Sequence, residues 1–168
     1  MKFFEMILAM LCISFFITGC DGSRAKELEC QSNLKQIGIS LMIYGVDYDN
    51  RLPPEHNEAG LQFIVKSGIS TDTEVFHCPA LKNNETGYYY IGGLIMGDSK
   101  FGRENFPIVF DKPGNHGNQV NVLFMGGYIE SIEIPNYQNP EDVIKVAGEK
   151  AKLSQEDIAF LLERCREM

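Results

Sequence analysis

Residues 120–134 read VNVLFMGGYIESIEI, and this stretch says more about the fold class than any other part of the chain. Two runs rich in β-branched and aromatic residues, 120–124 and 128–134, flank the pair Gly126 and Gly127. β-branched residues favour strands, and glycine accepts the positive φ angles that a tight primed hairpin turn requires. The stretch therefore predicts a β-hairpin, in which both glycines have a structural role rather than a ligand-binding one.

A long amphipathic helix is predicted over residues 24–47, well ahead of the hairpin. Its apolar side chains recur at steps of three and four residues, which is the period of a helix with one buried face, at Leu34, Ile37, Leu41 and Tyr44. Two prolines at 53–54 then stop the helix. A long N-terminal helix followed by a small antiparallel sheet predicts an α+β domain in which the helix packs on the sheet.

Shorter elements complete the expected domain. Apolar periodicity and turn residues predict further helices over 58–66, 140–147 and 154–165. Strand-like runs occur at 73–76, 88–91 and 107–110, and polar runs at 82–87 and 111–118 predict loops. We assign residues 24–135 to the α+β domain and residues 136–168 to a C-terminal helical tail.

The N-terminus predicts export and lipid attachment. Lys2 precedes an apolar run over residues 6–17, which is too short to span a membrane but suits a signal-peptide core. The sequence Ile-Thr-Gly-Cys that ends at Cys20 resembles the lipobox of bacterial lipoproteins. We therefore expect a signal peptide at 1–19, a lipid on Cys20, a tether at 20–23, and a domain anchored to the cell membrane that faces the periplasm or the exterior. An uncleaved anchor and an ordinary leader are the alternatives.

Composition excludes some partners. The 168-residue chain carries a formal net charge of -8, and its 15 Lys and Arg residues form no clusters. A surface that binds nucleic-acid phosphates is therefore not expected.

Three cysteines remain after lipidation and removal of the leader: Cys30, Cys78 and Cys165. Three thiols allow three different single pairings. In an oxidising compartment we favour a Cys30–Cys78 disulfide, because both cysteines precede conformationally restricted parts of the domain. Three buried free cysteines are the alternative.

The order of these motifs resembles a prepilin-type, pseudopilin-like family from planctomycete- and lentisphaera-like bacteria. The helix of that family reads C-x-x-N-L-K-Q-I-G before an acidic turn and L-P-P, and residues 30–38 and 47–54 match this pattern. The step Cys78–Pro79 is similar to its middle segment. Its closing motif has a histidine, nine residues and then Asp-Gly, which is similar to residues 116–127. The resemblance implies a pilin-like head linked to type II secretion or pilus-like machinery.

Two departures from that family change the expected role. No glycine precedes Phe3 as a pilin cleavage site would require, and the long apolar stalk that packs pilins into fibres is missing. Gly126 replaces the aspartate of the closing motif, so a carboxylate ligand is lost there, whereas His116 is kept. The resemblance therefore implies a pseudopilin-like head that is carried on a lipid.

Catalytic and metal-binding patterns are weak. The three histidines lack the spacing of a zinc-binding helix, and no serine lies in a nucleophile elbow. His77, Cys78 and His116 form a candidate zinc set, weighed against loop histidines that cap backbone groups. Asp47 and Asp49 are calcium candidates, but their run lacks the pattern of an EF-hand loop, and an acidic helix end explains them equally. We expect no cofactor and no enzymatic activity.

The function expected from the sequence is a membrane-tethered interaction or scaffold domain that contacts protein partners of an envelope assembly. A lipoprotein that holds a sugar or a peptide on the aromatic strand at 88–90 is the alternative, and a small hydrolase comes third.

Overall fold

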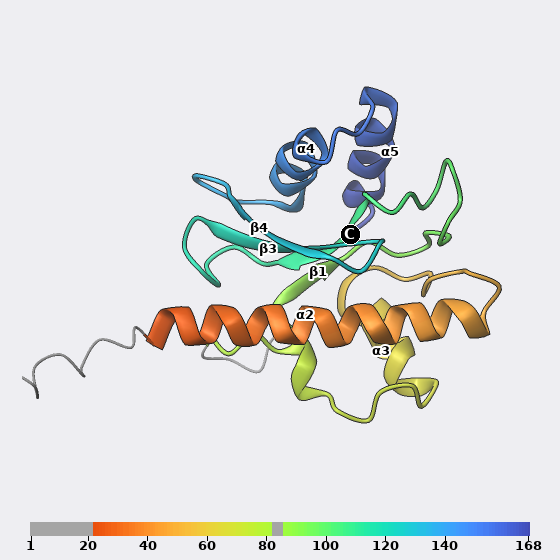
Figure 1. Cartoon of the computed structure of the whole chain (residues 1–168), viewed down its shortest axis with the longest axis horizontal. Coiled ribbons are helices and arrows are strands. Elements are labelled where there is room, and N and C mark those ends of the chain that lie inside the picture. Colours follow the sequence, from red (N-terminus) through yellow and green to blue (C-terminus); the bar gives the residue numbers. More distant parts are fainter. Residues whose placement is uncertain (1–21, 82–85) are drawn as a thin grey trace, which may run out of the picture.

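The computed structural model describes residues 22–81 and 86–168 (Figure 1). The expected signal peptide at 1–19, the lipidation site Cys20 and residues 82–85 of an expected loop lie outside the described residues. The remaining chain has a mixed helix and strand fold, as predicted: a long N-terminal helix, a four-stranded antiparallel sheet and C-terminal helices.

The elements follow the predicted order. The helices are α2 (Gly22–Asp47), α3 (Asn57–Lys66), α4 (Pro140–Lys150) and α5 (Gln155–Arg166). The strands are β1 (Tyr88–Tyr90), β2 (Pro107–Asp111), β3 (Gln119–Phe124) and β4 (Ile129–Glu133). Helix α2 begins two residues earlier than expected, so Gly22 and Ser23 belong to the helix and not to a tether.

One segment was predicted incorrectly. Residues 73–76 form a short 3-10 helix, η1 (Glu74–Phe76), instead of a strand. The Asp72 carboxylate accepts the backbone N–H of Glu74 at 3.0 Å, which is the hydrogen bond of an Asx turn. In a strand, Val75 and Phe76 would point to opposite faces, whereas the tight turn buries both side chains.

The strands form a simple meander in the order β1-β2-β3-β4, and every neighbouring pair is antiparallel. The predicted hairpin is β3–β4, but its turn differs from the prediction. Only Gly127 has a positive φ angle, of 78°. Its N–H donates to the Phe124 carbonyl at 2.8 Å, and the Phe124 N–H donates to the Tyr128 carbonyl at 3.0 Å. The connection is therefore a three-residue loop with one left-handed glycine, instead of a two-residue primed turn.

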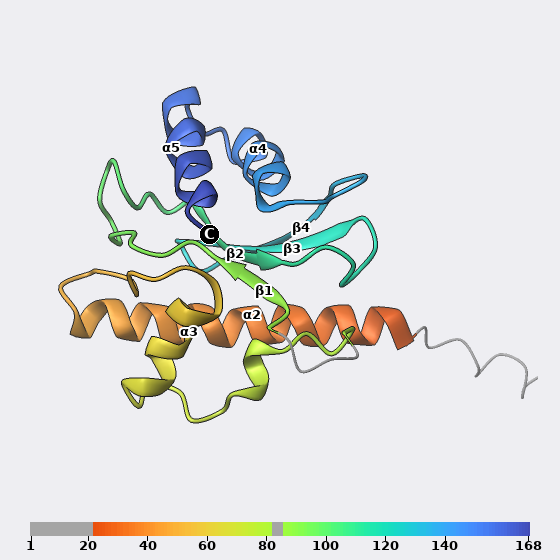
Figure 2. The same ribbon diagram turned by 180° about the vertical axis from the view of Figure 1, so that it is seen from behind.

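Helices cover both faces of the sheet. Helix α2 runs along one face, and α4 and α5 lie on the other, as Figure 2 shows from behind. All five residues of β2 and five of the six in β3 are buried, which requires cover on both sides. The helices of residues 136–168, expected as a C-terminal tail, therefore pack on the same core as the rest of the described chain.

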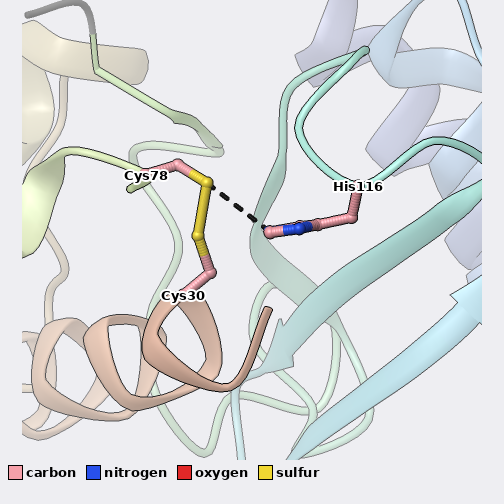
Figure 3. Close-up of side chains that lie close together, drawn as sticks. All are labelled: Cys30, Cys78 and His116. Atoms are coloured by element: carbon pink, nitrogen blue, oxygen red, sulfur yellow. Dashed lines mark hydrogen bonds between the residues drawn. A yellow bond between two sulfur atoms is a disulfide. The ribbon is translucent and has the colours of Figure 1, made fainter. Parts of the chain in front are cut away.

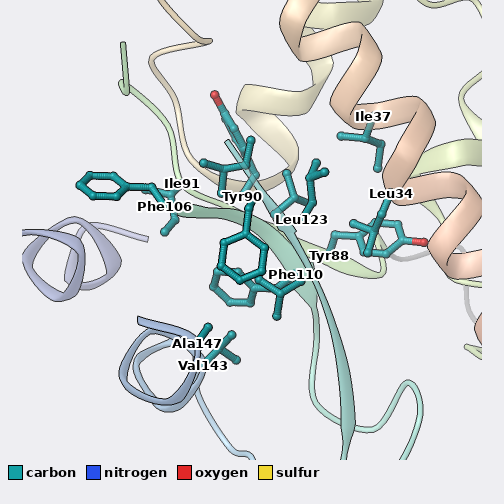
Figure 4. Packing of buried hydrophobic residues seen from close by; sticks show 14 of the residues in the cluster. Leu34, Ile37, Tyr88, Tyr90, Ile91, Phe106, Phe110, Leu123, Val143 and Ala147 are labelled. Carbon is teal, nitrogen blue, oxygen red and sulfur yellow. The ribbon is translucent and has the colours of Figure 1, made fainter. Parts of the chain in front are cut away.

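The hydrophobic core is continuous through these layers (Figure 4). Leu34 and Ile37 of α2 approach the sheet from one side, and Val143 and Ala147 of α4 approach Phe110 from the other. All five side chains are fully buried. Helix α4 therefore completes the core that α2 begins.

Candidate functional site

The predicted disulfide joins α2 to the segment that follows η1. Cys30 and Cys78 are bonded, with their Cα atoms 5.5 Å apart. Cys30 lies on the buried face of α2, and Cys78 comes two residues after η1, just before Pro79. Both are buried, as is the free cysteine Cys165. The bond connects two elements that are 48 residues apart in the sequence.

His116 points at this disulfide from the loop between β2 and β3 (Figure 3). Its Nε2 atom lies 3.5 Å from Cys78 Sγ. Only 4% of its side chain is exposed, and this burial lowers the pKa of the imidazole despite the opposing charge of Glu27. At neutral pH the ring is therefore uncharged, with a lone pair on one nitrogen.

A buried carboxylate lies near the same nitrogen of the histidine. Asp111, the last residue of β2, has its Oδ2 atom 3.9 Å from His116 Nε2. The backbone N–H and the side-chain amide of Asn121 both donate to Oδ2 at 2.8 Å, whereas Oδ1 has no hydrogen-bond partner. Burial raises the pKa of Asp111 to about 7, against the effect of these hydrogen bonds.

The polar network extends from Asp111 back to α2. Gln31, the neighbour of Cys30, donates its amide N–H to Asn121 Oδ1 at 2.9 Å. Tyr137 donates its hydroxyl to the Asp111 carbonyl at 2.8 Å. The network therefore connects α2, two central strands and the segment before α4 around the disulfide.

Sequence reasoning found part of this cluster. The zinc set was expected to contain His77, Cys78 and His116. The structure brings Cys78 and His116 together, but Cys30 takes the place of His77 as the third member. Asp111 and Asn121 were missed, although one signal was available: each is a polar residue inside or directly after a run of buried strand residues, where a polar side chain needs a partner.

The calcium candidates lie elsewhere. Asp47 ends α2, and Asp49 follows it with a φ angle of 54°. Both residues are exposed. Within residues 22–81 and 86–168, the only group of three or more His, Cys, Asp or Glu side chains that could hold a metal ion is Cys30, Cys78 and His116, so no third side chain of these types joins the aspartate pair.

A second surface feature is an apolar stripe on the outer side of α2. Ile39, Ile43 and Val46 are 49%, 46% and 75% exposed. Their spacing of four and three residues places them in one row along the helix. Helix α2 therefore carries more apolar surface than its packing on the sheet requires.

A third feature is a hollow of about 250 Å³ beside α3. Leu61 and Val65 of α3, Phe76 of η1 and His77 contribute to its wall. The aromatic strand that was expected to hold a ligand does not line it: Tyr88 and Tyr90 are fully buried in the core and Tyr89 is half-buried.

No protein-family model, curated protein or solved structure matches this chain. Among the helices of the described part of the chain, none combines the length and the apolar character that crossing a membrane requires.

Proposed function

We propose that this protein is a non-enzymatic, lipid-anchored interaction domain that resembles a pseudopilin head and binds a protein partner through the apolar stripe Ile39–Ile43–Val46 of α2. The observation that carries the proposal is the exposure of three branched aliphatic side chains in one helical row. Exposed apolar groups that are contiguous are typical of interaction sites. Type II secretion or pilus-like machinery is the class of assembly that the sequence resemblance suggests.

Charge complementarity indicates the chemistry of the partner. The stripe ends at the C-terminus of α2, where the last turn has no basic residue. Asp47 and Asp49 are exposed there and add to the partial negative charge of the helix end. With a net charge of -8, a second copy of the chain is repelled. The surface therefore fits an apolar helix bordered by Lys or Arg residues.

Site-specific photocrosslinking in cells tests this proposal. A photoreactive residue in place of Ile43 should give one discrete protein adduct, and peptide mapping should place it on an apolar helix next to basic residues. The adduct should be lost with Ile39→Asp and weakened by Asp47→Lys together with Asp49→Lys. Val146 on α4, which is 37% exposed, is the matched control position and should give no such adduct.

Three outcomes would overturn the proposal. Adducts to a second copy of the chain would indicate self-assembly, and adducts to lipid would indicate that α2 lies on the bilayer. Equal adducts from positions 43 and 146 would show that the stripe has no specific partner.

The hollow beside α3 favours a second candidate function, the binding of a sugar or a short peptide. Its wall is largely apolar and a hollow of about 250 Å³ accepts only a small group. A ligand from a panel of sugars and peptides should raise the melting temperature of the wild type, and Val65→Arg should abolish that shift by filling the hollow. If no ligand in the panel shifts the wild type, this second candidate fails while the first is unaffected.

A further inference from the structure

The disulfide and the histidine beside it together contain the residue types of a metal site. One ligand atom each from Cys30, Cys78 and His116 lies within 4.8 Å of the others. The two cysteines are at most 2% exposed, and the imidazole is 4% exposed. A histidine that merely capped a loop would not need to place its Nε2 atom beside a buried sulfur.

We propose that reduction of the Cys30–Cys78 disulfide converts this cluster into a binding site for one Zn²⁺ ion, with Cys30, Cys78 and His116 as its protein ligands. The inference goes beyond the interaction function, since it concerns a different part of the molecule. Two thiolates and one imidazole are common zinc ligands, and three protein ligands leave a fourth position for water.

The geometry requires little movement. In a tetrahedral zinc site with ordinary bond lengths, ligand atoms lie about 3.5 Å apart. Cys78 Sγ and His116 Nε2 already lie 3.5 Å apart. Cleavage of the S–S bond frees the two sulfur atoms to move to that separation. The Cys30 side chain is held by α2 and the Cys78 side chain by the segment between η1 and Pro79, so the ligands come from two anchored elements.

Asp111 supplies a second, independent observation. It is 1% exposed, yet its Oδ1 atom has no hydrogen-bond partner. Because Oδ2 of the same carboxylate lies 3.9 Å from His116 Nε2, a cation bound at that nitrogen would interact favourably with this carboxylate.

A dithiol reductant supplies the electrons and protons that reduction of the disulfide requires. The reductant transfers two electrons and two protons to the disulfide, which yields two cysteine thiols and an oxidised reductant disulfide. Zn²⁺ then displaces the two thiol protons and binds the two thiolates and the neutral imidazole. Cys78 and Pro79 line an open groove of about 370 Å³ beside α2, which brings a small dithiol reductant next to the residue that carries the sulfur.

Metal titration of the full-length protein in detergent tests the inference. The Cys165→Ser background removes the third thiol. After reduction and removal of the reductant under nitrogen, the protein should bind one equivalent of Zn²⁺ and its melting temperature should rise. Co²⁺ used as a probe should give a thiolate-to-metal charge-transfer band. The oxidised protein should show none of these changes.

Two histidine variants test whether His116 binds the Zn²⁺ ion or only lies near it. In the reduced protein, His116→Ala should weaken Zn²⁺ binding at least about tenfold, since even outer partners of zinc ligands contribute this much. His77→Ala removes the histidine adjacent to Cys78 and should leave the affinity unchanged. Equal affinities of wild type and His116→Ala would overturn the site. Equal binding by the oxidised protein, or a reduced protein that neither binds Zn²⁺ nor refolds with it, would also overturn it.

Discussion

At the scale of single residues, Asp111 has the largest expected effect on the pH dependence of stability. Its pKa rises from 3.8 to about 7 because folding buries the carboxyl group. The folded state therefore holds a proton that the unfolded state releases, and the free energy of unfolding contributed by Asp111 falls as pH rises from about 4 to 7.

Asp111→Asn should remove this dependence. Between pH 5 and pH 8 the wild type should lose about 2–3 kcal/mol more stability than the variant. Urea denaturation at both pH values measures the difference. The lowered pKa of His56 acts in the opposite direction in both proteins and cancels in the comparison, whereas His116 lies 3.9 Å from Asp111, so the comparison reports Asp111 together with its effect on His116. Parallel pH profiles would show that Asp111 is ionised in the folded protein.

The hairpin turn depends on the backbone conformation of Gly127. Its φ angle of 78° is strained for a branched side chain, so Gly127→Val should lower the free energy of unfolding by about 1–3 kcal/mol. Gly126 is the control, because its φ angle is not positive and an added Cβ would meet the backbone oxygen of Glu104 at 3.2 Å, a tight contact without a clash. Gly126→Ala should therefore lower the free energy of unfolding less than Gly127→Ala in the same denaturation assay.

At the scale of elements, the two C-terminal helices begin with the same capping motif. Both have a capping box: Asn139 with Asp142 in α4, and Ser154 with Asp157 in α5. They differ in their surroundings, because Asp157 is buried and also accepts a hydrogen bond from Arg103 at 2.8 Å.

Asp157→Ala should accordingly lower the free energy of unfolding more than Asp142→Ala does. Loss of an exposed cap costs about 1 kcal/mol. Removal of Asp157 also leaves donors of Ser154 and Arg103 without their acceptor, which brings the expected cost to about 2 kcal/mol. Thermal denaturation of both variants gives the comparison. Equal costs would mean that Arg103 contributes nothing to the stability of α5.

At the scale of the whole molecule, the core cannot be divided at residue 135. Helix α4 covers one face of β2, and Arg164 of α5 donates to the Gly92 carbonyl at 2.8 Å. A protein shortened to residues 22–135 should therefore lose cooperative unfolding, because Phe110 and its neighbours would face water. Near-UV circular dichroism measures this loss. A cooperative transition in the shortened protein would show that residues 22–135 fold without the C-terminal helices.

A soluble form that contains only residues 22–168 should be folded and should not form filaments. Its longest helix buries one face on its own sheet, and the remaining stripe of three apolar side chains is small beside the stalk of a pilin. Light scattering and negative-stain microscopy should show monomers or small oligomers. Ordered filaments would instead favour a pilus subunit.

The sequence alone determined the local elements of this protein. The periodic apolar residues of α2, the strand–glycine–strand pattern of β3 and β4, and the capping residues of α5 each act over a few residues, so their conformations follow from neighbouring side chains. The preference for a Cys30–Cys78 bond was also correct. The exceptions were the type of the β3–β4 turn and η1, where one hydrogen bond to Asp72 and the burial of two adjacent apolar residues outweighed strand propensity.

Only the tertiary structure decided which distant segments of the chain lie next to one another. Packing of α4 and α5 on the second face of the sheet joined the C-terminal segment to the core, and no local pattern specifies which face a helix covers. The β2–β3 loop places His116 beside the disulfide, and Asp111 at the end of β2 lies 3.9 Å from that histidine. These contacts join residues far apart in the sequence, because the shape of the folded core brings them together and their spacing along the chain does not.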